Sequence, residues 1–492
     1  MPTKEDKLPR TGPGLAYRFW CPIFPSLESR LPWTGVVPWI YCSFHFIWTI
    51  LTLPLQCILI LLSYIPFIGC IFRGPVAIRP SWGIGQTLFL TAFQKFIWTW
   101  FWGLPTGNAT PFILNGIPFT AKFFNCSGIF RSMGRSIFGM TKTGPDVLDF
   151  EEVLIDPAPS DWFYGPVTDP FGIVVPGPVA CYWVTQADKE RKVKRGSGKV
   201  LVYLVQGGFI RSNSLEAPFA YNICRETSTP LLTVEYRKAV DRSRCFPASI
   251  QDALAGYYYL LTLGYLPENI LVMGDSAGGG LVHTLLLQLS TLRSQGIKSI
   301  NDQFVQPPGR VLMLSPWVDL TMSMGDNTLH RYDIIYPPME QQGASCYLAK
   351  PGVKYYKNRE ADQKARAANY PSVRAEQPLI SPALRTPEVA AALDIIATAA
   401  SECGGIKVMI MYGGTEVSGP EAKQLAANLR DAASRHSKLS RSPSIDVLLV
   451  EGKDGIHCYG SFYNAKSSEG VIFWNHIRSH LNQPLGSPSL LV

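Results

Sequence analysis

Short apolar runs alternate with longer stretches of helical periodicity through most of this chain of 492 residues, beginning near Phe150. Apolar runs of four to eight residues between turn-forming residues are typical of buried strands. Strands that alternate with helices form mostly parallel sheets covered on both faces. We therefore expect an α/β protein with a mostly parallel, doubly wound sheet of eight strands: Glu151–Asp156, Ala180–Thr185, Val200–Val205, Leu231–Tyr236, Asn269–Met273, Arg310–Leu314, Lys407–Tyr412 and Ile445–Val450.

A different pattern sets the first part of the chain apart. No Lys, Arg, Asp or Glu occurs from Leu31 to Ile71, and this stretch is rich in Trp, Ile, Leu and Phe. A helix that crosses a bilayer needs about 20 mostly apolar residues. We expect a transmembrane signal anchor at residues 36–72, kinked at Pro54. The alternatives are a buried helix of the folded domain and a hairpin of two helices that returns the chain to the cytosol.

Flanking charges orient this segment. Five basic residues precede it, whereas only Arg73 and Arg79 follow it closely. The positive-inside rule then makes residues 1–35 cytosolic and the remainder lumenal, with the endoplasmic reticulum as the expected location. Two Asn-x-Ser/Thr glycosylation acceptors, Asn108 and Asn125, agree with the lumenal side. We expect residues 73–149 to form a membrane-proximal aromatic region that lies in the interface or covers a site.

Composition excludes several other functions. The net charge of +8 is spread along the chain, and its densest run, Lys189–Lys199, lies in an expected turn, so no nucleic-acid partner is indicated. The 11 cysteines include no Cys-x-x-Cys pair and no metal-binding motif occurs, so we expect neither a metal nor a cofactor. A lumenal location would permit one or two disulfides.

The strongest chemical signal is the Gly-x-Ser-x-Gly sequence at residues 274–278. It lies between the expected strand Asn269–Met273 and a helical stretch at Leu281–Leu292, and this order is typical of a nucleophile elbow. Such a sharp, strained turn needs small neighbours and exposes the serine hydroxyl at a helix N-terminus. Ser276 is therefore the candidate nucleophile.

An elbow serine needs a base and an orienting acid, which follow it in the chain. Glu416 closes the turn after the strand Lys407–Tyr412 and is the candidate acid. His457 lies in the loop after the last expected strand and is the candidate base. Glu421 and Asp319 remain as alternative acids. The other histidines are expected to be surface or packing residues: His45, His283, His330, His436, His476 and His480.

The sequence Val205-Gln206-Gly207-Gly208-Phe209 follows a strand, and here the chain resembles the hormone-sensitive-lipase-like branch of the α/β-hydrolases, which carries His-Gly-Gly-Gly-Phe. Further segments are similar to landmarks of that branch: Glu235–Ala239, Cys245–Ala248 with Asp252, Leu314–Trp317 with Asp319, and Leu379–Pro382. Within this branch the chain resembles the membrane-anchored deacetylases of fungal steryl acetates and the arylacetamide deacetylases. The resemblance implies an α/β-hydrolase domain over residues 150–484, with a cap insertion at about 320–377.

The resemblance also implies an oxyanion hole. In the family the amides of the residues matching Gly207 and Gly208 join the amide after the nucleophile, here that of Ala277. Gln206, Phe209 and Asp275 are expected beside the substrate, with Gln206 at the mouth of the pocket.

The chain departs from the family pattern at three positions. Val205 replaces the histidine, Gln206 replaces the first glycine, and Gly280 replaces the asparagine that commonly follows the elbow. These departures remove no proposed triad residue, but they affect the geometry of the oxyanion loop.

Together these features predict a serine hydrolase that cleaves carboxylic esters through an acyl-enzyme. An apolar pocket under the cap would suit an acetyl ester of a lipophilic small molecule such as a sterol, terpenoid or polyketide. Two other functions remain open. One is acyl transfer or cyclisation in natural-product biosynthesis, and the other is ligand binding without catalysis.

Overall fold

The computed structural model describes two parts of the chain. Near the N-terminus it describes residues 47, 51–62, 84 and 87–88, and beyond them 148–485 apart from 187–194, 211, 213–217, 326–328, 330–332, 336, 351–362, 366–371, 438–443 and 462–467. Contacts within the chain divide it into two units, Met1–Asn108 and Ala109–Val492.

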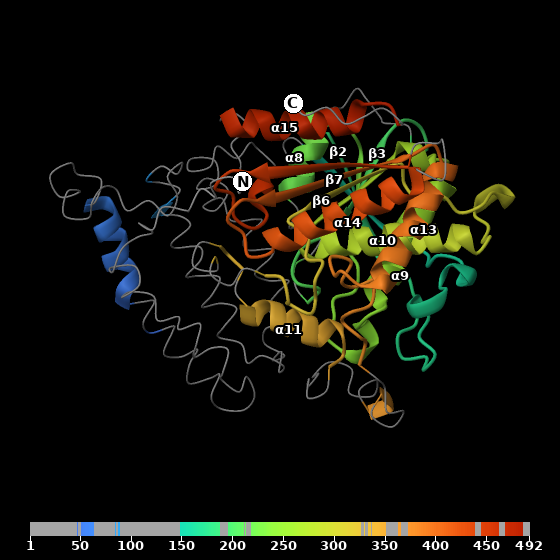
Figure 1. Ribbon diagram of the computed structural model, residues 1–492, viewed down its shortest axis with the longest axis horizontal. Coiled ribbons are helices and arrows are strands. Elements are labelled where there is room, and N and C mark those ends of the chain that lie inside the picture. The colour runs from blue at the N-terminus through green and yellow to red at the C-terminus, as the bar shows by residue number, and fades with distance from the viewer. Residues whose placement is uncertain are drawn as a thin grey trace. The chain divides into compact units, whose positions relative to one another are not determined.

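One eight-stranded sheet forms the centre of the second unit (Figure 1), in the order β1-β2-β4-β3-β5-β6-β7-β8. β2 pairs antiparallel with β1 and β4, and the strands from β3 to β8 are parallel. The predicted mostly parallel sheet is therefore confirmed. The strands are Leu148–Ile155, Val179–Gln186, Val200–Leu204, Leu231–Val234, Ile270–Asp275, Arg310–Leu314, Ile406–Gly413 and Ile445–Gly452, numbered β1 to β8.

The central strands are apolar on both faces because helices cover both. Every residue of β3, β5, β6 and β7 is buried, whereas only part of the edge strand β8 is. This explains why the sequence shows continuous apolar runs instead of alternation.

Helices cover the sheet from both sides (Figure 1). α8 and α15 lie on one face, where Phe219 and Phe473 meet edge to face. α9, α10, α13 and α14 cover the other face. The helices are α8 Pro218–Thr227, α9 Ala248–Thr262, α10 Ala277–Ser294, α11 Pro337–Tyr347, α13 Pro387–Glu402, α14 Gly419–Ser437 and α15 Ser468–Asn482. Short 3-10 turns occur at Ser160–Trp162, Gly165–Val167, Arg242–Arg244, Pro267–Asn269, Ile300–Asp302 and Tyr459–Ser461.

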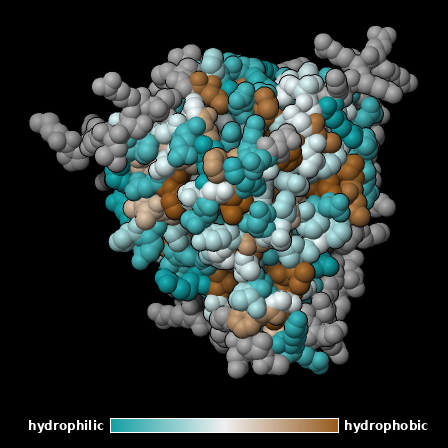
Figure 2. Space-filling view, turned by 90° about the vertical axis from the view of Figure 1, so that its right-hand side faces the viewer, coloured by the Kyte–Doolittle hydropathy of each residue, from teal (hydrophilic) through white to brown (hydrophobic). Residues whose placement is uncertain are grey.

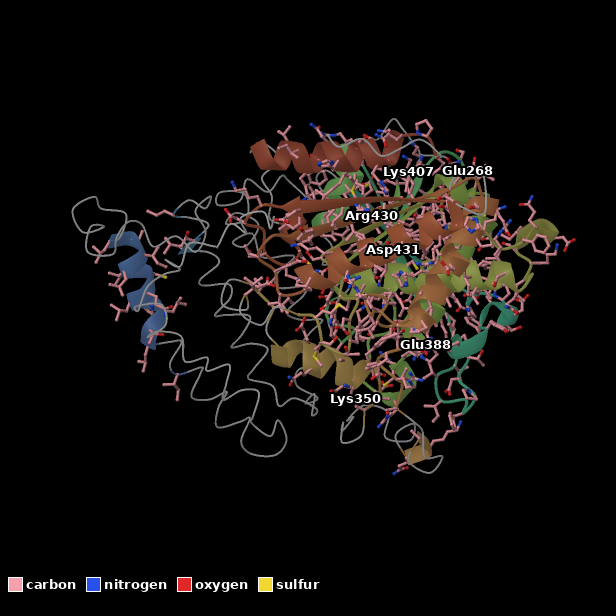
Figure 3. The ribbon with its side chains drawn as sticks, in the orientation of Figure 1. Glu268, Lys350, Glu388, Lys407, Arg430 and Asp431 are labelled. Atoms are coloured by element: carbon pink, nitrogen blue, oxygen red, sulfur yellow. The ribbon has the colours of Figure 1, made fainter. Side chains whose placement is uncertain are left out.

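Buried cations fix the edge of the sheet where the parallel strands begin. Arg310, the first residue of β6, donates to the carbonyl oxygens of His480 at 3.1 Å and Gln483 at 2.6 Å, at the end of α15. It also donates to the carbonyl of Glu268 at 2.8 Å and pairs with Lys407 of β7 across the sheet. Figure 3 labels Glu268 and Lys407 toward this edge. A cation near the C-terminus of a helix satisfies carbonyls that have no partner within the helix. The opposite edge, where the parallel strands end, carries the candidate site.

The surface shown in Figure 2 carries hydrophobic residues in separate small groups between hydrophilic ones. Scattered apolar side chains are ordinary on the surface of a globular domain.

In the first unit, residues 51–62 form a helix. Leu51, Leu55, Ile58 and Leu61 are 39–68% exposed. Within the described residues no helix is both long enough and apolar enough to cross a membrane. Most of the predicted anchor at 36–72 lies outside the described residues, as do residues 1–35, nearly all of 73–149, and both acceptors, Asn108 and Asn125.

Candidate active site

Ser276 forms the turn between β5 and α10. Its φ of 55° and ψ of −124° lie in a backbone region that residues with a side chain rarely adopt. The sharp turn of a nucleophile elbow requires such a conformation. The Ser276 amide donates to the carbonyl of Leu314 at 3.0 Å, which ties the turn to β6. The side chain is 8% exposed.

The glycines around Ser276 are required by close backbone contacts. A Cβ atom on Gly278 would lie 2.0 Å from the carbonyl oxygen of Leu204, and one on Gly280 would lie 2.3 Å from that of Trp317. The Trp317 amide in turn donates to the Ser276 carbonyl at 3.0 Å. The loop after β6 therefore fills the space that an asparagine at position 280 would need.

Glu416 and His457 follow the adjacent parallel strands β7 and β8, and the structure brings them together. His457 Nδ1 lies 3.8 Å from Glu416 Oε2 and 3.3 Å from the hydroxyl of Ser418. Both Glu416 and His457 are at most 3% exposed. His457 Nε2 is also buried and has no hydrogen-bond partner within the described part of the chain. This nitrogen is the one that would accept a proton from a nucleophile.

Burial controls the charge of this pair. It lowers the pKa of His457 to about 3, so the imidazole is neutral near pH 7 and able to accept a proton. Burial, and then the nearby charge of Asp333, raise the pKa of Glu416 well above its usual range, while hydrogen bonds from Ser315 and Ser418 oppose that rise. The carboxyl group is therefore ionised most readily when the imidazole becomes positive.

The alternative acids make other contacts. Glu421 Oε2 accepts from the amides of Val318 and Asp319, both at 3.0 Å. Asp319 accepts from amides of its own turn, including Ser323 at 2.8 Å and Met324 at 3.0 Å. Both side chains therefore hold the loop after β6. Of the remaining histidines, His283 lies in α10, His436 in α14, and His476 and His480 in α15, whereas His45 and His330 lie outside the described residues.

The loop after β3 contains three consecutive residues with positive φ: Gly207 at 112°, Gly208 at 60° and Phe209 at 64°. The Tyr236 hydroxyl donates to the Val205 carbonyl at 2.7 Å, so this loop is held although the family histidine is absent. β3 and β5 are neighbours, so the loop lies at the same sheet edge as the elbow. Ala277 is the first residue of α10, and its N–H therefore has no acceptor within the helix.

Gln206 and Asp275 belong to one buried cluster. The hydroxyl of Tyr203 lies 2.6 Å from Gln206 Oε1 and 2.5 Å from Asp275 Oδ1. Burial raises the pKa of Asp275 to about 7, so a protonated carboxyl can supply the second hydrogen of this cluster near neutral pH. Asp275 is 1% exposed, and its side chain points toward Tyr203 beneath the elbow. Gln206 is half-buried, and its amide oxygen contacts the hydroxyl of Tyr203.

Aromatic side chains cover the loop after β3. Phe209, which is 3% exposed, stacks on Tyr347 of α11 with ring centres 3.9 Å apart, and Trp317 lies on its other side at 5.9 Å. A Cβ on Gly343 would lie 2.6 Å from the Gly208 carbonyl oxygen, so α11 packs directly against the loop.

Sequence reasoning did not identify Ser418, Tyr203 or Asp333 as parts of this site. Asp333 follows no predicted strand, yet its carboxylate accepts from the backbone of His457 at 2.8 Å. Among the described residues no cluster of three or more His, Cys, Asp or Glu side chains could hold a metal ion. The cysteines that the structure describes are free thiols: Cys57, Cys181, Cys224, Cys245, Cys346, Cys403 and Cys458.

Comparison with known proteins gives consistent matches. A family model described as the alpha/beta hydrolase fold matches residues 201–444. An acetyl-hydrolase of Streptomyces hygroscopicus is 28% identical over 163 residues, which are 33% of this chain and 48% of that protein. A putative steryl acetyl hydrolase of Schizosaccharomyces pombe is 36% identical over 91 residues, which are 18% of this chain and 21% of that protein.

A solved structure of an esterase from the bacterial hormone-sensitive lipase family has a TM-score of 0.43 and 21% identity, covering 68% of this chain and 83% of that one. The matched segments span less than half of the length of the two curated relatives. The family model, the strand order and the strained Gly-x-Ser-x-Gly turn agree with one another. This chain therefore has the α/β-hydrolase fold, and its motifs resemble those of the hormone-sensitive-lipase-like branch.

Proposed function

We propose that this protein is a carboxylic ester hydrolase with Ser276 as nucleophile, His457 as base and Glu416 as the orienting acid. The observation that carries the proposal is the strained Ser276 turn at the same sheet edge as a buried His457 within 3.8 Å of a carboxylate. The names of the relatives, an acetyl-hydrolase and a putative steryl acetyl hydrolase, support the same reaction class.

The proposed reaction has two steps. Ser276 Oγ attacks the ester carbonyl while His457 Nε2 takes its proton, and Glu416 stabilises the resulting imidazolium through Nδ1. The amides of Gly207, Gly208 and Ala277 donate to the oxyanion. The imidazolium then protonates the departing alcohol, and a water activated by His457 hydrolyses the acyl-enzyme.

For the substrate we propose an acetyl ester of a lipophilic alcohol, such as a sterol. Phe209, Tyr347 and Trp317 are buried against one another and make the surroundings of the loop after β3 apolar, which favours a hydrophobic substrate over a sugar or a peptide. The name of the fungal relative supports a steryl acetate in particular.

Ser276→Ala tests the nucleophile. We expect this variant to keep the melting temperature of the parent and to lose labelling by a fluorophosphonate probe together with ester hydrolysis. Glu416→Gln and His457→Ala should each lower kcat by at least about 10³, and Glu421→Gln, which leaves the pair intact, is the matched control.

Three outcomes would contradict parts of this proposal. Labelling that persists in Ser276→Ala would place the nucleophile elsewhere, and a parent protein that neither labels nor hydrolyses esters would favour a binding function. Transfer of the acyl group to an added alcohol in preference to water would favour the acyl-transferring alternative.

We also propose that the N-terminal segment anchors the protein in the endoplasmic reticulum membrane with the catalytic domain lumenal. The uncharged stretch from Leu31 to Ile71 supports it. The helix at 51–62 also supports it, because Leu51, Leu55, Ile58 and Leu61 are exposed while Thr52, Gln56 and Ile60 are buried. The protein should resist extraction by alkaline carbonate and lose mass on glycosidase treatment unless Asn108 and Asn125 are both changed to Gln. Resistance to extraction without glycans would favour the cytosolic hairpin, and release by carbonate would exclude an anchor.

A further inference from the structure

Asp333 lies in the connection between β6 and α11, outside the strands that carry the candidate triad. Its carboxylate is 1% exposed and accepts backbone hydrogen bonds from His457 at 2.8 Å, from Val417 at 2.8 Å and from Ile334 at 2.7 Å. Two of these donors lie in the loops that carry the candidate acid and base: Val417 follows Glu416, and the other donor is His457 itself.

Other hydrogen bonds join the two loops nearer to the sheet. The Gly414 amide donates to the Gly452 carbonyl at 2.8 Å, and the Thr415 amide donates to the Gly455 carbonyl at 3.0 Å. Among side chains, Ser418 Oγ lies 3.5 Å from Glu416 Oε1 and 3.3 Å from His457 Nδ1. Ser315 also contacts Glu416 and accepts from the Cys458 amide at 2.9 Å. Asp333 differs from both because its carboxylate accepts from the backbone amides of Val417 and His457.

We propose that Asp333 is a positioning residue, which sets the separation of Glu416 and His457 by bridging the backbone amides of Val417 and His457. This inference rests on the proposed function and adds a residue from the β6–α11 connection to its site. The imidazole meets its acid at 3.8 Å, so a small movement of either loop would change the contact on which proton transfer depends. Misplacement of a catalytic group by about 1 Å can cost on the order of 10²-fold in rate.

Asp333 also acts on Glu416 through its charge. It is the largest contribution after burial to the raised pKa of Glu416, and Tyr412, Cys458 and His457 are the other titratable groups near that carboxyl. Glu340 and Cys458 are the further titratable groups that face Asp333. Removal of a negative charge beside Glu416 lowers the pKa of that carboxyl, so it is ionised at a lower pH.

The test is Asp333→Asn in the full chain, assayed with 4-nitrophenyl acetate across a range of pH. We expect kcat to fall about tenfold to a hundredfold with KM changed less than threefold, and the acidic limb of kcat/KM to move to lower pH. Asp319→Asn is the matched control, because Asp319 is also buried and accepts loop amides but touches neither triad loop. The folded fraction of the Asp319→Asn variant should have the same kcat and the same pH profile as the parent protein.

Asp333→Glu keeps the charge and lengthens the side chain, so kcat should fall while the acidic limb stays in place. This variant carries the test if Asp333→Asn does not fold. Equal effects of the Asp333 and Asp319 variants on kcat, or a parent-like kcat in Asp333→Glu, would overturn the inference.

Amide hydrogen exchange gives a readout that needs no activity: residues 414–418 and 455–458 should exchange faster in the Asp333 variants. Unchanged exchange would overturn the inference, whereas an inactive parent would contradict only the proposed function.

Discussion

The cluster of Tyr203, Gln206 and Asp275 changes the expected role of a single residue. From the sequence, Gln206 is a side chain at the pocket mouth that selects among substrates. In the structure its amide oxygen lies 2.6 Å from the Tyr203 hydroxyl, which also contacts Asp275 of the elbow. A side chain held by its neighbours in this way connects the loop after β3 to the elbow.

We therefore expect Gln206→Gly to lower kcat/KM by a similar factor for acetyl, butyryl and longer esters. A net hydrogen bond of about 0.5–1.5 kcal/mol corresponds to roughly a two- to thirteenfold loss. Tyr203→Phe also removes the contact with Asp275, so its loss should be at least as large. The double variant should lose less than the sum because both changes remove the same contact between Tyr203 and Gln206. A change in the ratios between esters would instead support the selective role.

The three residues that the sequence predicts as a triad share one property. Ser276, Glu416 and His457 each follow the end of a buried parallel strand, and this position can be read from apolar runs and chain order. Asp333 cannot be found in this way because its partners are backbone amides far away in the sequence. Gln206 was located correctly in its loop, but the partner of its side chain is set by packing around Tyr203.

At the scale of elements, the apolar runs predict the strands closely because their central members are buried on both faces. The strand Arg310–Leu314 has its predicted bounds. The strand expected to reach Tyr236 ends at Val234, and the Tyr236 hydroxyl bonds to the Val205 carbonyl in the neighbouring loop. Tertiary contacts at the strand end, which local propensity does not include, decide such boundaries.

The helix α11 was not predicted, although the surrounding interval was expected to form a cap. Its sequence from Pro337 to Tyr347 contains few apolar residues, so the helical period is weak. Long-range contacts hold it instead: Tyr347 stacks on Phe209, and its carbonyl accepts from the Phe246 amide at 3.0 Å. The same contacts pack α11 against the loop after β3.

For the molecule as a whole, buried ionisable groups predict a stability maximum at mildly acidic pH. Burial raises the pKa of Asp275 to about 7 and of Asp333 to about 6 from a usual 3.8, so their contribution to stability is complete below about pH 4 and is lost as pH rises through 6–7. Burial lowers the pKa of His283, His457 and His480 from 6.5 to about 3, so stability falls as pH drops through that range.

Thermal unfolding from pH 3 to 9 should therefore give the highest melting temperature between about pH 4 and 6.5. Asp275→Asn cannot ionise at position 275 and should show a flatter decline above pH 6 than the parent protein. A melting temperature that rises steadily to pH 8 would contradict this account of the buried carboxyl groups.

The contact between Gly280 and the Trp317 carbonyl also restricts how this sequence can evolve. With a Cβ only 2.3 Å from that oxygen, no larger residue fits at position 280 until the loop after β6 moves away. A single change to the asparagine of the family pattern would therefore clash with the backbone of Trp317, whereas a prior change in that loop could make room for it. The two positions are thus coupled, and the side chain that position 280 tolerates depends on the path of the loop after β6.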